Sequence, residues 1–129
     1  MREKSRLPES ELDIMLAVWG AEGPATAPHI LERLERPISP SALHSYLKRL
    51  EEKGYLSCAK SGKVNCYTPL VSREEYRERE GRTVLQKLYD NSLKRFAAAL
   101  YDGGELAPAD LEELRTYLDE LERGSARHV

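Results

Sequence analysis

The sequence predicts a mainly α-helical protein with one small β-hairpin, which places it in the α+β class. Three observations predict this class. Apolar residues recur at helical spacing through most of the chain, the spacing changes to that of strands over residues 55–68, and glycine, proline and capping residues separate the segments. The 129 residues suffice for one compact domain or for two small ones that share a core.

The first helix is predicted between Pro8, which suits a first helical turn, and Gly20, which ends it. Acidic residues alternate with apolar ones here, as in an amphipathic surface helix. The apolar face is expected to consist of Leu12, Met15, Leu16 and Trp19.

A capping residue introduces each of the next two helices. Thr26 is expected to cap a short helix, and Ser39, followed by Pro40 in the first helical position, is expected to cap a longer one that ends at Gly54. The predicted apolar residues are Ile30, Leu31 and Leu34 in the shorter helix, and Leu43, Leu47 and Leu50, with Tyr46 beside them, in the longer one.

Two short strands are predicted at residues 55–60 and 63–68, around a turn at Ser61-Gly62. Three short helices followed by a hairpin is the order of a winged helix-turn-helix. Cys58 and Cys66 lie on opposite strands of this hairpin. The two-residue turn would place them on opposite faces, whereas a three-residue loop would pair them directly, so a redox role and two half-buried side chains both remain open.

Residues 72–123 are predicted to be helical. Ser72 and Glu75 form a capping box for a helix that reaches Tyr89, a second helix runs from Leu93 to Tyr101, and Pro108 opens a third. The last helix has leucines at the spacing of a coiled-coil seam, and two heptads alone are marginal in water, so this region is expected to need a partner. The residues expected to pair two chains are Val84, Leu85, Leu88, Phe96, Leu111, Leu114, Leu118 and Leu121. A monomeric cap folded back on residues 1–70 is the alternative.

The charge is distributed unevenly along the chain. The whole sequence has 20 Lys and Arg against 22 Asp and Glu, a net charge of −2. Residues 39–68, however, contain five basic residues and two acidic ones, a net of +3. A local basic face of this kind can bind phosphates while the chain as a whole stays acidic.

The order and spacing of several motifs resemble the penicillinase-repressor family (BlaI, MecI and CopY type) over residues 7–122. The motifs are Leu12-Asp13-Ile14-Met15 with Trp19, Ser39-Pro40, residues 50–56, Gly62-Lys63, Tyr67-Thr68-Pro69, residues 88–92 and residues 110–114. The resemblance implies a homodimeric winged-helix transcriptional repressor that binds an inverted-repeat operator in double-stranded DNA and dimerises through its C-terminal helices. The expected organisation is a DNA-binding domain at 1–71, a helical dimerisation domain at 72–123 and a flexible tail at 124–129.

In such a fold the third helix would enter the major groove and the hairpin, or wing, would touch neighbouring phosphates. The predicted DNA-binding residues are Ser39, Ser41, Ala42, His44, Ser45, Lys48, Arg49, Lys60 and Lys63. Arg49 would contact the DNA backbone or pair with a carboxylate in the core. The family more often has Lys-Thr where this chain has Ser41-Ala42, so a different base preference is expected.

The resemblance also implies a regulatory partner. Inducible members of the family are inactivated by a receptor-linked protease that cuts the dimerisation helices, and the matching bond here is Ala99–Leu100. The asparagine–phenylalanine pair usual at that bond is absent, and alanine is also simply a good helix former, so both interpretations of this segment remain open.

No enzymatic or metal site is expected. The sequence has no glycine-rich phosphate loop or nucleophile elbow, and His29, His44 and His128 match no metal-ligand spacing. We therefore expect neither a cofactor nor a metal. No apolar segment long enough for a membrane span or a secretory signal is present, which predicts a cytoplasmic protein. The alternatives to a promoter-occluding repressor are a winged-helix module that binds another protein, and a repressor that senses a ligand between its C-terminal helices.

Overall fold

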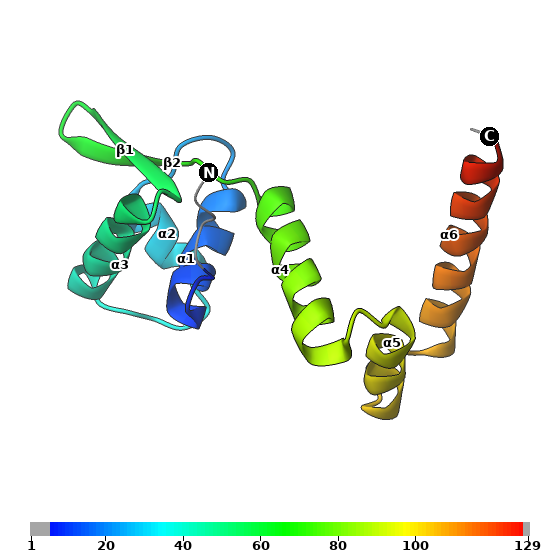
Figure 1. The fold of residues 1–129 in the computed structure, drawn as a ribbon. Helices are drawn as coiled ribbons and strands as arrows, with labels where there is room; N and C mark the ends of the chain where they lie inside the picture. The colour runs from blue at the N-terminus through cyan, green and yellow to red at the C-terminus, as the bar shows by residue number, and fades with distance from the viewer. Residues whose placement is uncertain (1–5, 128–129) are drawn as a thin grey trace. The chain divides into compact units, whose positions relative to one another are not determined.

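The computed structural model describes residues 6–127, with side chains as far as Gly124. The elements, in order, are α1 (Glu9–Trp19), α2 (Ala27–Arg33), α3 (Pro40–Glu52), β1 (Leu56–Ser61), β2 (Val64–Pro69), α4 (Arg73–Tyr89), α5 (Leu93–Asp102) and α6 (Pro108–Arg127) (Figure 1). Contacts between residues divide the chain after Glu80 into two units, here called unit 1 (to Glu80) and unit 2 (from Gly81). No helix within the described residues combines the length and apolar character needed to cross a bilayer.

Helix α1 forms where expected, and Leu12, Met15 and Trp19 of its predicted apolar face lie in the core or pack against it. Ile14, Met15 and Val18 are buried, whereas Leu16 is 44% exposed. The prediction was therefore wrong for Leu16, and it did not include Ile14 and Val18. Glu11 is also buried, in spite of its charge, and completes an inner face at the i, i+3, i+4, i+7 spacing.

The predicted caps of α2 and α3 are confirmed. The Thr26 hydroxyl accepts a hydrogen bond from the backbone N–H of His29 at 3.4 Å, and the Ser39 hydroxyl accepts one from Ala42 at 3.1 Å. Each satisfies an amide that the first helical turn leaves free. Gly54, with φ of +84°, ends α3 in the left-handed region as predicted.

The hairpin forms with a register two residues away from the predicted one. Ser61 pairs with Val64 and Cys58 with Tyr67, so the turn consists of Gly62 and Lys63 and not of Ser61 and Gly62. Gly62 takes φ of +67°, which favours glycine as the first residue of a tight hairpin turn. Ala25 adds an isolated antiparallel bridge to Tyr67 on β2.

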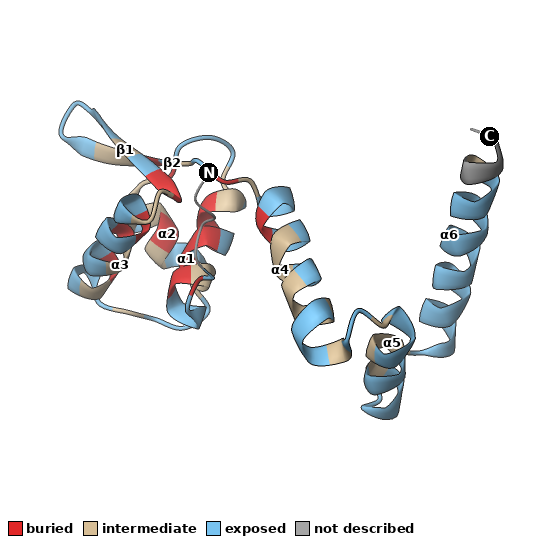
Figure 2. Ribbon diagram, viewed as in Figure 1, coloured by how far each residue is buried: buried red, intermediate tan, exposed pale blue. Residues whose placement is uncertain are grey.

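Unit 1 contains the hydrophobic core. α1, α2, α3 and the hairpin pack together, and Figure 2 shows that buried residues gather in these elements and at the start of α4. The predicted inward residues of α3 are at most 1% exposed. The largest fully buried side chains are Tyr55, Ile14, Met15, Ile30, Leu43, Leu47, Leu50, Leu56 and Val18. Three helices and a hairpin around this core make a winged helix-turn-helix.

Helix α4 begins with the predicted capping box. The Ser72 N–H donates to Glu75 Oε1 at 3.2 Å, and the Glu75 N–H donates to the Ser72 hydroxyl at 3.1 Å. The sequence places a domain boundary at 71/72, whereas the contacts divide the chain at 80/81. The first two turns of α4 belong to unit 1 because Tyr76 is buried in its core.

Unit 2 contains the rest of α4 together with α5 and α6. Asp90 and Asn91, both with positive φ, form the corner between α4 and α5, and the Ser92 hydroxyl caps α5 by accepting a hydrogen bond from the Arg95 N–H at 3.1 Å. Helix α6 continues to Arg127. The tail expected from residue 124 is therefore helical through 127, and residues 128–129 lie outside the described residues.

Candidate nucleic-acid interface

Helix α3 presents a continuous exposed face opposite its buried leucines. Ser41, His44, Ser45, Lys48 and Arg49 are all exposed, and Ala42 is half-buried. The leucines that hold the helix in place are separate from the side chains that face solvent. An α-helix with short side chains near its N-terminal end can approach the edges of bases in a major groove closely. The exposed hydroxyl of Ser39 is already engaged in capping the helix.

Arg49 lies over the ring of Tyr46, with its guanidinium carbon 5.7 Å from the ring centroid. This cation–π contact orients the guanidinium along the exposed face of α3. Of the two roles expected for Arg49, contact with DNA fits this position better than an ion pair inside the core. The contact of the Tyr46 ring with Arg49 was not predicted, although the i, i+3 spacing of the two residues could have indicated it.

The wing brings two predicted lysines to the end of the hairpin. Lys60 lies in β1 opposite Asn65, Lys63 is part of the turn, and both are exposed. Strand β1 packs against α3, so the wing and the exposed helix belong to the same unit. Unit 1 therefore carries Lys48 and Arg49 on one element and two more cations on another. This arrangement can contact phosphates on the backbone beside a groove.

Lys53 does not contribute to this basic surface. Its Nζ donates a hydrogen bond to Glu11 Oε1 at 2.6 Å, and Glu11 is only 3% exposed. The charge of Lys53 is therefore largely neutralised inside the fold. The cations left over from the basic segment are Lys48, Arg49, Lys60 and Lys63.

Three buried tyrosines support the elements that carry this surface. Burial raises the pKa of Tyr55, and the nearby Arg79 guanidinium offsets part of the rise. Burial also raises the pKa of Tyr76 and of Tyr67, and in Tyr67 the adjacent Cys58 thiol raises it further. All three phenols therefore stay neutral to a higher pH than an exposed tyrosine does.

The observed register decides the geometry of the two cysteines. Cys58 is opposite Tyr67 and Cys66 is opposite Ala59, so the two thiols point to opposite faces of the hairpin. The direct pairing that a three-residue loop would have produced does not form, and both cysteines are free and half-buried. The predicted opposite faces are confirmed, although the turn that produces them is at different residues.

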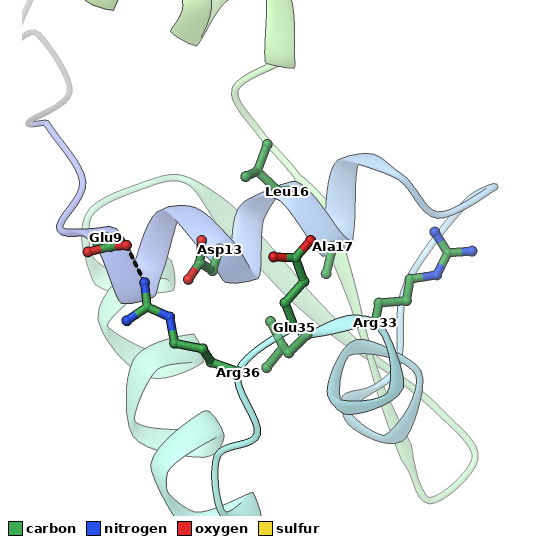
Figure 3. A pocket seen from close by; sticks show the side chains of 8 residues that line it. Glu9, Asp13, Leu16, Ala17, Arg33, Glu35 and Arg36 are labelled. Carbon is green, nitrogen blue, oxygen red and sulfur yellow. Dashed lines mark hydrogen bonds and ion pairs between the residues drawn. The ribbon is translucent and has the colours of Figure 1, made fainter.

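A separate pocket of about 510 Å³ lies on unit 1 between α1 and the end of α2 (Figure 3). Leu16, Ala17 and Leu34 form its apolar part, and Glu9 makes an ion pair with Arg36 at its edge. The other lining residues are Asp13, Arg33 and Glu35. None of the predicted DNA-binding residues lines this pocket.

The residues predicted to pair two chains lie on all three helices of unit 2. Val84 and Leu85 are half-buried, and Phe96 packs edge-on against Tyr89 with a centroid separation of 5.1 Å. The predicted leucines are largely exposed: Leu88 71%, Leu111 38%, Leu114 43%, Leu118 47% and Leu121 48%. Leu93, Tyr101 and Tyr117 are further exposed apolar residues of the same helices, and the prediction did not include them. The spacing of Tyr117, three residues after Leu114 and four before Leu121, could have indicated it.

The Ala99–Leu100 bond lies inside α5, with Ala99 exposed and Leu100 half-buried. Proteases bind their substrates as extended strands, so cleavage at this bond would require that part of α5 to open. Cleavage there stays a prediction. Within the described part of the chain, no three His, Cys, Asp or Glu side chains come together as a metal site would require.

The comparisons with known proteins agree with one another. A family model described as penicillinase repressor matches residues 7–120. The chain is 26% identical to the penicillinase repressor of Bacillus licheniformis over 93% of this chain and 94% of that protein. It is 24% identical to the methicillin resistance regulatory protein MecI of Mammaliicoccus sciuri, over 85% and 90% of the two chains. It also resembles, at 27% identity and a TM-score of 0.50, the solution structure of the Bacillus licheniformis BlaI monomeric form in complex with the blaP half-operator, over 59% of this chain and 94% of that one.

Proposed function

Because this chain belongs to the penicillinase repressor family, we propose that it is a homodimeric transcriptional repressor that occludes a promoter by binding an inverted-repeat operator. The observation that carries the proposal is the exposed face of α3, which combines Ser41, His44, Ser45, Lys48 and Arg49 on a helix whose packing uses none of them. A similar protein has been solved on a half-operator, which supports assigning DNA as the ligand of this face.

Each subunit would bind one half-site. The N-terminal part of α3 enters the major groove, where His44 and Ser45 reach base edges and the methyl group of Ala42 can touch a thymine methyl. Lys48 and Arg49 lie further along the helix and contact the backbone, while Lys60 and Lys63 contact phosphates beside the groove. These cations release counterions on binding, so the affinity falls steeply as the salt concentration rises.

A second copy of the chain would cover the exposed apolar side chains of α4, α5 and α6. Leu111, Leu114, Leu118 and Leu121 recur at alternating spacings of three and four, and each leaves 38–48% of its surface exposed. Completing the burial of such a side chain stabilises an association by about 1 kcal/mol. A symmetric dimer buries these leucines on both chains. It also places the two α3 helices about 34 Å apart, which is one turn of DNA.

The test is a selection of genomic DNA fragments with the purified full-length protein, followed by footprinting at two salt concentrations. A protected inverted repeat with half-sites about one turn apart, bound more weakly at high salt, is the expected result. A folded dimer that enriches no DNA at moderate salt would contradict the proposal and favour the protein-interaction module. Enrichment that a small molecule abolishes would favour the ligand-sensing repressor.

A further inference from the structure

The first two turns of α4, Arg73–Glu80, are held against the rest of unit 1 by specific side-chain contacts. The Tyr76 hydroxyl accepts a hydrogen bond from the backbone N–H of Leu7 at 3.2 Å. Arg79 Nη2 donates to the Tyr55 hydroxyl at 2.8 Å, and its guanidinium carbon lies 5.6 Å from the centroid of the Tyr76 ring. These contacts fix the direction of this part of the helix within unit 1.

The contacts of α4 also involve the elements that carry the proposed DNA-binding surface. Tyr55, fully buried between the end of α3 and the start of β1, packs edge-on against Tyr76, with ring centroids 6.0 Å apart. Tyr76 also packs against Trp19 of α1 at 5.7 Å. The last fastened residue is Glu80, which accepts a hydrogen bond from Arg6 Nε at 3.0 Å.

Gly81 is the next residue, and no packing or backbone constraint calls for a glycine there. A Cβ added to Gly81 would meet no atom within 4 Å, and the residue continues an α-helix that reaches Tyr89. The contacts of the chain divide between Glu80 and Gly81. A glycine in a helix interior loses more conformational freedom than alanine on folding, so it weakens the helix at its own position.

We propose that Gly81 is a joint in α4 that lets each DNA-binding unit of the dimer change its direction relative to the dimerisation helices. The consequence, which rests on the proposed function, is that the repressor accepts inverted repeats with more than one spacing between half-sites. One added base pair moves the second half-site by about 3.4 Å along the DNA axis and rotates it by about 35°. Side-chain contacts hold the helix as far as Glu80, and the glycine weakens it at the next residue. A bend that accommodates the new spacing can therefore form at that one residue.

The first measurement is amide hydrogen exchange of the free full-length protein, with Gly81→Ala compared to the wild type. The substitution is expected to slow exchange at residues 82–85 about four- to fivefold and to leave residues 77–80 unchanged. Gly124→Ala is the matched control, because Gly124 also lies inside a helix with open space around it. Equal exchange at 82–85 in the wild type and in Gly81→Ala would overturn the joint.

The second measurement is binding to a set of operators in which the selected inverted repeat is lengthened or shortened by one and two base pairs. The wild type and Gly124→Ala should bind neighbouring spacings with similar affinity. Gly81→Ala should keep its affinity for the best spacing and for an isolated half-site, and lose about tenfold or more elsewhere. An unchanged spacing profile would overturn the proposed consequence. If the wild type selects no DNA, the proposed function fails, and the exchange measurement still decides whether the joint exists.

Discussion

Lys53 Nζ and Glu11 Oε1 lie 2.6 Å apart, which ties the end of α3 to the buried inner face of α1. Glu11 is 3% exposed and the Lys53 side chain 30% exposed, so the carboxylate depends on this cation more than the cation depends on the carboxylate. A charge buried without a partner is costly, whereas a partly exposed ammonium keeps much of its hydration. The pair therefore holds the C-terminal end of α3 against α1.

Replacing Lys53 by Met should lower the free energy of unfolding by about 2 kcal/mol, because it leaves the Glu11 carboxylate buried without its cation. Chemical denaturation of the full-length protein measures the loss. The double variant Glu11→Met/Lys53→Met should recover most of it, since neither charge then remains. A Lys53→Met protein as stable as the wild type would show that the buried Glu11 side chain does not depend on Lys53.

Replacing both wing lysines by glutamine should weaken binding to the selected operator and flatten its dependence on salt. Each phosphate contact contributes about one unit to the slope of log affinity against log salt, so Lys60→Gln/Lys63→Gln should reduce it by as much as about four per dimer. Titrations at several salt concentrations measure the slope. Lys87→Gln/Lys94→Gln removes the same charge from exposed positions in unit 2 and should leave the slope unchanged. A slope equal to that of the wild type in the wing variant would remove the wing from the interface.

Glutamate at Leu114 and Leu118 should convert the dimer into a monomer, because it places four carboxylates in the apolar stripe of the pair. Sedimentation of the full-length protein measures the change. Binding to an isolated half-site should be retained while binding to the full repeat weakens. Leu16→Glu is the control, since Leu16 is a comparably exposed leucine in unit 1. A stable dimer of the Leu114→Glu/Leu118→Glu protein would exclude α6 from the pairing surface.

The protein should lose stability as the pH rises above 10. Burial raises the pKa of Tyr55, Tyr67 and Tyr76 above the value of about 10 that holds in the unfolded chain. The folded state thus retains protons that the unfolded state releases, so the contribution of these phenols is complete below pH 10 and is lost as the pH rises toward the folded pKa values.

Melting temperatures between pH 8 and pH 11 measure this loss. Tyr55→Phe should be less stable than the wild type at neutral pH, because it loses the hydrogen bond from Arg79, yet its decline above pH 10 should be shallower. Tyr117→Phe, at an exposed position in unit 2, should decline as the wild type does. Equal declines for Tyr55→Phe and the wild type would show that Tyr55 is not protected from ionisation.

Signals that act within a few residues could be predicted from the sequence. The caps Thr26, Ser39, Ser72 and Ser92 each bond to an amide three residues away, and all four start helices where expected. The buried face of α3 could also be predicted, because the spacing of its leucines alone determines one face of the helix.

Features that depend on distant partners could not be predicted in this way. The inner face of α1 includes Glu11 only because Lys53 lies beside it after folding. The packing of Tyr55, Tyr76 and Trp19 joins three separate segments of the chain, so no sequence pattern within one segment indicates it. The turn of the wing was misplaced because glycine fits either of its two central positions, and the pairing of Ser61 with Val64 decides between them.

Only part of the candidate nucleic-acid interface could be predicted from the sequence. The exposed positions of α3 followed from the leucine spacing, whereas the removal of Lys53 from the basic surface required the fold. The contact between Arg49 and Tyr46 lies within one helical turn, so its geometry could have been read from their spacing.

The division of α3 into a buried and an exposed side affects how such a protein can change over generations. Leu43, Leu47 and Leu50 are buried in the core, while Ser41, His44 and Ser45 are exposed on the other side of the helix. Exchanges at such surface positions typically change the free energy of unfolding by less than about 0.5 kcal/mol. Under the proposed function, new target sequences can therefore be acquired through nearly neutral substitutions, and a small library randomised at these three positions is a practical starting point for selecting new specificities.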